Sequence, residues 1–93
     1  MAIEIPPGRP QIEYFEQGDQ WTPRGCVLRC VIDDGGPGNE PIIHVDDREL
    51  SWADFGRLLT TYAGWGMRIV FVPNDETHLE PRVEVSEPED GER

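Results

Sequence analysis

The segment of residues 50–72 limits the possible folds most strongly, because it combines a helix start, a helix stop and a β-prone run. Ser51 is a favoured N-cap residue, and Asp54 follows three positions later, as in a capping box. Apolar side chains then recur at offsets of three and four, which is the spacing of one buried helix face. They are Trp52, Phe55, Leu58, Leu59, Tyr62 and Ala63. We therefore expect one amphipathic helix here.

The end of this helix is marked by Gly64, which can adopt the left-handed conformation that closes a helix. Gly66 then allows the chain to turn sharply into residues 67–72, an unbroken β-prone run that we expect to be a buried strand. Gly56 lies within the apolar stripe, where glycine costs about 1 kcal/mol relative to alanine. We therefore also expect a second backbone to pass close to Gly56.

The run S-W-A-D-F-G-R-L-L, followed by T-Y-A-G-W-G, resembles a segment of small uncharacterised bacterial proteins that are grouped as a domain of unknown function. The resemblance covers residues 50–72, with weaker support from the segments before it. It implies no activity, ligand or catalytic residue.

Two further segments are predicted strands. Residues 26–32 are apolar on nearly both faces, which is typical of a central strand, and residues 42–45 return beside them as a hairpin after a loop rich in glycine and proline. A right-handed crossover through the helix would pair residues 67–72 antiparallel with residues 26–32, and residues 82–85 could add an edge strand. The predicted fold class is α+β: a small, mainly antiparallel sheet of three to five strands with one amphipathic helix packed on one face.

The length of 93 residues allows one domain at most. Residues 1–20 are predicted to form an irregular or edge-strand arm, residues 21–85 a single α+β domain, and residues 86–93 a disordered acidic tail. The net charge is −11, yet residues 20–73 hold seven acidic residues and five arginines, whereas residues 74–93 hold eight acidic residues and two arginines. Most of the acidity is therefore expected to flank the folded part.

Charge and hydropathy argue against several classes of protein. No run of about 18 apolar residues is present, and the first residues lack the basic and apolar regions of a signal peptide, so we expect a cytoplasmic protein without membrane association. An acidic chain also lacks the basic patch that direct nucleic-acid binding requires. The opposite role stays open as an alternative: an acidic inhibitor, or a DNA-mimic decoy of a nucleic-acid-binding protein.

The residues that could support catalysis or metal binding are few. They are Cys26, Cys30, His44 and His78, together with acidic pairs at residues 33–34 and 46–47. On a strand the two thiols would lie about 13 Å apart, too far to share a disulfide or a zinc ion, and we expect them to be buried. The acidic pairs fall at opposite ends of the predicted hairpin, where turn residues are common. We predict no catalytic residue, metal or cofactor, and a minimal thiol-dependent or metal-dependent enzyme remains a second alternative.

One helix covers only one side of a sheet, so the other side should be open. Val27, Val31 and His44 are predicted on that open face. Trp21 lies close to Arg24, a combination typical of protein contacts, although packing of the indole against the sheet would explain it equally. The leading hypothesis is a non-enzymatic protein-interaction or accessory module, which binds a protein partner or a second copy through the open face or an edge of the sheet.

Overall fold

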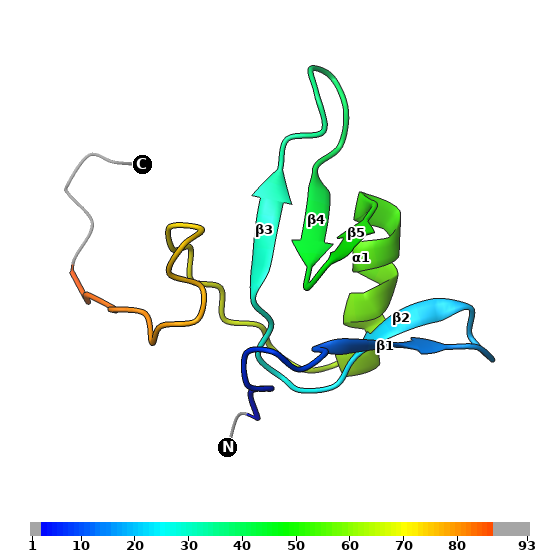
Figure 1. Cartoon of the computed structure of the whole chain (residues 1–93), viewed down its shortest axis with the longest axis horizontal. Helices are drawn as coiled ribbons and strands as arrows, with labels where there is room; N and C mark the ends of the chain where they lie inside the picture. Colours follow the sequence, from blue (N-terminus) through cyan, green and yellow to red (C-terminus); the bar gives the residue numbers. More distant parts are fainter. Residues whose placement is uncertain (1–2, 87–93) are drawn as a thin grey trace.

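The structure, a computed structural model, describes residues 3–86 as two small antiparallel sheets and one helix (Figure 1). The strands are β1 (Ile12–Phe15), β2 (Gln20–Pro23), β3 (Cys30–Asp33), β4 (Ile42–Val45) and β5 (Arg48–Leu50). The helix is α1 (Trp52–Leu59), which continues into a 3-10 turn (Thr60–Tyr62). Strands β1 and β2 form one sheet, and the second has the order β3-β4-β5. The predicted α+β class is confirmed.

The three-stranded sheet separates its side chains onto two faces. Ile43 of β4 pairs with Ile32 on β3 and with Leu50 on β5. The neighbouring pair, Val31 with His44, lies one residue earlier on β3 and one residue later on β4. Because successive side chains of a strand point to opposite faces, Ile43 and Leu50 share one face and Val31 and His44 the other. The predicted hairpin between β3 and β4 is confirmed, although β3 begins at Cys30 and not at residue 26.

The helix begins as its sequence predicts, but α1 ends at Leu59 and its 3-10 continuation at Tyr62, both before Gly64. The Asp54 N–H donates to the Ser51 hydroxyl at 3.1 Å, and Gly64 has the expected left-handed φ of +91°. Leu58 is fully buried, whereas Trp52 at the first position is 44% exposed. The close backbone expected at Gly56 is wrong, because an added Cβ would meet no atom within 4 Å.

The core is small and lies where the two sheets and the helix meet. Its buried members are Ile12, Ile43, Val45, Leu50 and Leu58, which come from β1, β4, β5 and α1. The β1–β2 hairpin crosses the lower end of α1 in Figure 1, which brings Ile12 to the same cluster. Part of the segment predicted as an N-terminal arm therefore contributes to the core.

The predicted strand at residues 67–72 is wrong, as is the edge strand at residues 82–85, because neither segment forms a ladder. The reason is β5, a strand that was not predicted and that adds one reversal of direction before the helix. The helix consequently follows the strand at the far side of the sheet from β3, and the chain leaves it at the end of the sheet where β3 begins (Figure 1). The expected antiparallel pairing within the chain is then not available.

Two further sequence predictions concern the C-terminal tail and membrane association. The predicted acidic tail at residues 86–93 falls outside the described residues except for Ser86. Within residues 3–86, no helix has the length and apolar character that a membrane crossing requires.

Candidate binding site beside strands β3 and β4

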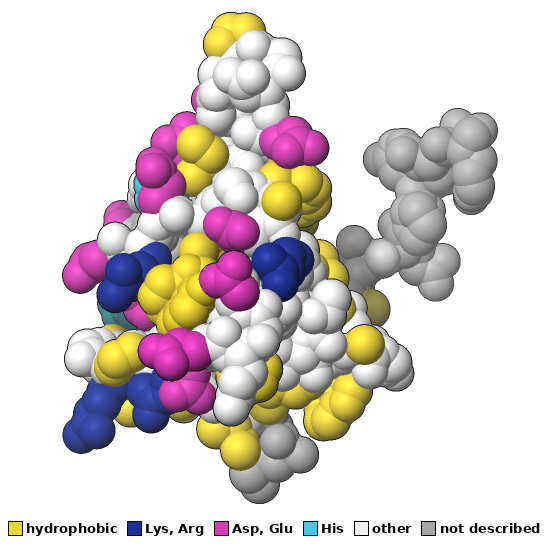
Figure 2. All heavy atoms as spheres, turned by 90° about the vertical axis from the view of Figure 1, so that its right-hand side faces the viewer, with side chains coloured by type: hydrophobic (Ala, Val, Ile, Leu, Met, Phe, Trp, Pro, Cys, Tyr) yellow, Lys and Arg dark blue, Asp and Glu magenta, His cyan; other side chains and the backbone are white. Residues whose placement is uncertain are grey.

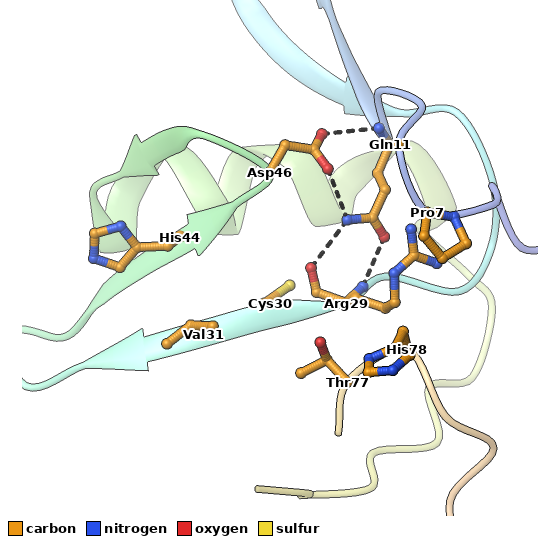
Figure 3. A pocket seen from close by; sticks show the side chains of 10 residues that line it. Pro7, Gln11, Arg29, Cys30, Val31, His44, Asp46, Thr77 and His78 are labelled. Atoms are coloured by element: carbon orange, nitrogen blue, oxygen red, sulfur yellow. Dashed lines mark hydrogen bonds between the residues drawn. The ribbon is translucent and has the colours of Figure 1, made fainter. Parts of the chain in front are cut away.

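A shallow hollow of about 360 Å³ lies beside β3 and β4 (Figure 3). Its walls come from the N-terminal segment, from β3 and the residue before it, from β4 and its following turn, and from a segment near residue 77. The lining residues are Pro7, Gly8, Gln11, Arg29, Cys30, Val31, His44, Asp46, Thr77 and His78. The hollow therefore joins parts of the chain that are far apart in the sequence.

One wall is fixed by Gln11, the buried polar residue that is only 2% exposed. Its side-chain amide donates to the Arg29 carbonyl at 3.1 Å and to Asp46 Oδ1 at 3.0 Å, while its oxygen accepts from the Arg29 N–H at 2.8 Å. The backbone N–H of Gln11 also donates to Asp46 Oδ2 at 2.9 Å. These bonds, drawn in Figure 3, satisfy the buried amide and tie the start of β1 to the second sheet. We call Gln11, Arg29 and Asp46 the Gln11 node.

The two partners in the Gln11 node are themselves held in place. Asp46 has a positive φ of 57°, a conformation that aspartate tolerates better than most residues, and this orients its carboxylate toward Gln11. Arg29 Nη1 donates to Glu4 Oε2 at 2.8 Å and to the Ile5 carbonyl at 2.7 Å. The guanidinium is therefore already paired and holds the N-terminal segment against the sheet.

The thiol of Cys30 is poorly suited to catalysis. Burial, and to a smaller extent the charge of Asp46, raise the pKa of Cys30 from 9.0 to about 11, although the nearby Arg29 acts to lower it. The thiol is thus protonated at neutral pH, and the nucleophilic form is the thiolate. Cys26 is also free, and the prediction that it is buried is wrong: it is exposed, and its sulfur accepts the Ile3 N–H at 3.0 Å.

The accessible part of the site is formed by Val31 and His44, which face each other across β3 and β4. Val31 is 40% exposed, and His44 Nε2 lies 3.6 Å from Asp33 Oδ2. Among residues 3–86, no three His, Cys, Asp or Glu side chains come together as a metal site would require. The accessible surface here is thus an apolar side chain next to an imidazole.

The structure brings together two of the five predicted binding residues. Val31 and His44 line the hollow, whereas Trp21, Arg24 and Val27 do not. Trp21 packs against the core, and its ring lies edge-on to the ring of Tyr14, with 5.4 Å between the ring centroids. The Arg48 guanidinium lies 4.7 Å from the centroid of the Trp21 ring. Arg24 Nη1 donates to the Pro10 carbonyl at 2.8 Å, and Val27 forms a parallel bridge with Glu4. These contacts give the three residues packing and tethering roles.

Sequence reasoning missed the Gln11 node. Gln11 reads as an ordinary polar residue between a proline and an apolar strand, and Asp46 as an ordinary turn residue. The two lie 35 positions apart, and no periodic pattern connects them. The one local signal is Asp-Asp after an apolar strand, since aspartate is enriched where the backbone is left-handed.

Comparison with known proteins identifies a family that covers most of this chain. Residues 11–76 match the model of a family described as Domain of unknown function (DUF7713). The matched range begins at Gln11 and includes the whole node, both sheets and the helix. It also extends well beyond the resemblance at residues 50–72. No curated protein and no solved structure matches the chain.

Proposed function

Since this match covers more than half of the sequence, the chain belongs to the DUF7713 family, and we propose that it is a non-enzymatic protein-interaction module that binds an extended polypeptide along β3. The observation that carries the proposal is the outer edge of β3. Within residues 3–86, β3 pairs with β4 on one side and has no ladder on the other. Its outward N–H and C=O groups can therefore accept an added strand.

The other ends of the two sheets are better protected against strand addition. Natural edge strands are commonly shortened, charged or interrupted by proline. Strand β5 has three residues and carries Arg48 and Glu49, β2 ends in Pro23, and β1 carries Glu13 within the strand. Strand β3 has four residues and ends in Asp33, but it carries no charge or proline between Cys30 and Ile32. It is thus the edge on which an extended partner fits best.

The side chains next to this edge can give the interaction its selectivity. Val31 and Ile32 are 40% and 59% exposed and lie on opposite faces of β3. On the Val31 side the hollow offers room for a partner side chain beside His44 (Figure 3). In strand addition the backbone supplies affinity and such recesses select alternate side chains.

Site-specific photocrosslinking in the source cell tests the proposal. A photoreactive phenylalanine analogue at Val31 is expected to form a protein adduct, and the same analogue at Phe15 is the control, because Phe15 is 46% exposed on the separate hairpin. Ile32→Lys is expected to abolish the adduct by adding a charge to the edge. Equal labelling from both positions, or no adduct at Val31, would overturn the proposal.

The two alternative roles gain less support. A DNA mimic needs a continuous array of carboxylates, whereas Figure 2 shows acidic side chains interspersed with arginines and apolar groups on the face it views. A thiol-dependent enzyme needs an ionisable nucleophile, and the raised pKa of Cys30 works against that role. Competition by DNA for the crosslinked partner at low salt is the result that would favour the first alternative.

A further inference from the structure

The outer edge of β3 fits one particular occupant. We infer that it binds residues 67–72 of a second copy of this chain, so that two copies exchange strands reciprocally. The inference rests on the proposed function, because it uses the same edge and names the partner. Two features of the same molecule support it. Residues 67–72 are exposed and β-prone, and the outer edge of β3 is open to a strand of that kind.

Residues 67–72 have the composition of a strand but no strand partner in the described part of the chain. Met67, Ile69 and Phe71 are 66%, 59% and 76% exposed. A row of apolar side chains at alternate positions is usually covered in a stable protein, and this one is not. The same chain offers exposed apolar side chains on β3, where Val31 lies on one face and Ile32 on the other.

Charge and hydropathy together favour one register. When the segment runs antiparallel to β3 with Arg68 opposite Asp33, Ile69 faces Ile32 and Val70 faces Val31. The two central apolar side chains of the segment then meet apolar side chains, and its one cation meets the carboxylate that ends β3. A slip by one residue in either direction places an apolar side chain against Asp33 and so loses the charge pair.

The direction of the chain explains why a second copy fits better than the chain's own segment. The chain leaves α1 at the end of the sheet where β3 begins, so its own residues 67–72 would run parallel to β3 (Figure 1). With Ile69 again facing Ile32, a parallel strand would place Arg68 opposite Val31 and Val70 opposite Asp33. In the structure this segment forms no ladder with β3, and Thr77 and His78 line the hollow instead (Figure 3). A second copy has no such constraint on its direction.

Reciprocal exchange also closes the assembly. Each copy supplies one segment and one edge, so a two-fold arrangement satisfies both and leaves neither open for further growth. A closed dimer is therefore expected rather than a filament.

Sedimentation equilibrium of the full chain at low ionic strength provides the test. The wild type is expected to reach twice the chain mass of 10.6 kDa. Arg68→Asp and Asp33→Arg should each raise the dimer dissociation constant about tenfold, because each substitution acts twice in a reciprocal dimer and opposes like charges. The double variant should restore the wild-type value, which also shows that the single variants are folded. Arg82→Asp is the matched control, since Arg82 lies outside the segment, and should have no effect.

Two results would overturn this inference: a monomer at every concentration, whether or not the amides of residues 69–71 are protected from hydrogen exchange, or a dimer that neither charge substitution weakens. The crosslink at Val31 separates this failure from that of the proposed function. An adduct with a different protein and a monomeric chain would leave the proposed function standing and refute the exchange. An adduct that maps to residues 67–72 of another copy would support both.

Discussion

Replacing Gln11 tests whether the Gln11 node holds the two sheets together. Gln11→Ala removes three side-chain hydrogen bonds of 2.8 to 3.1 Å and leaves the N–H and C=O of Arg29 without these partners. At about 1 kcal/mol for each hydrogen bond, the expected loss in the free energy of unfolding is about 3 kcal/mol. For a small domain, whose total stability is about 5–10 kcal/mol, this is a large fraction.

The loss is measurable by urea unfolding followed through tryptophan fluorescence. Since the free energy of unfolding falls by about 1 kcal/mol per molar urea, the urea concentration at the midpoint of unfolding should fall by about 2 to 3 M. Gln17→Ala is the matched control, because Gln17 is exposed in the turn of the same hairpin, and should change stability by less than about 0.5 kcal/mol. Gln11→Leu should cost at least as much as Gln11→Ala, because the larger apolar side chain excludes water from the orphaned backbone groups.

A double-mutant cycle locates the energy within the node. Asp46→Asn keeps a residue that tolerates the positive φ of 57° but turns one accepting oxygen into a donor. Combined with Gln11→Ala it should show a coupling of at least about 0.5 kcal/mol. If Gln11→Ala costs no more than the Gln17 control, or if the two substitutions are additive, the node does not join the sheets as argued.

Four other substitutions test the local arguments. Gly56→Ala should stabilise the protein by about 1 kcal/mol in the same urea assay, because α1 has space for a methyl group there, whereas Gly64→Ala should destabilise it by about 1 kcal/mol at φ +91°. Ser51→Ala should cost about 1 kcal/mol through loss of the 3.1 Å N-cap bond, and an unchanged midpoint would contradict that role. Because burial raises the pKa of Cys30 from 9.0 to about 11, the unfolded chain releases its thiol proton first, and stability should fall as pH rises from 9 to 11. Cys30→Ala should lose less stability than the wild type over this pH range. An equal loss in the two proteins would refute the assignment of the pH dependence to Cys30.

The sequence determined those features that depend on neighbours along the chain. Ser51 sets the start of α1 and Gly64 takes its left-handed conformation beyond the helical turns, because N-cap bonding and left-handed backbone are properties of a few consecutive residues. The β3–β4 hairpin followed from two β-prone segments and the loop between them. The fold class follows from these local elements.

Only the tertiary structure decided how these elements meet. Strand β5 is three residues long, too short for a periodic pattern, yet it reverses the chain once more and thereby removes the expected place for residues 67–72. Gln11 and Asp46 meet across 35 positions because both sheets pack on the same small core, and no local signal encodes that contact. Local preferences act over a few residues, whereas the open edge of β3 and the Gln11 node depend on which distant segments are brought side by side.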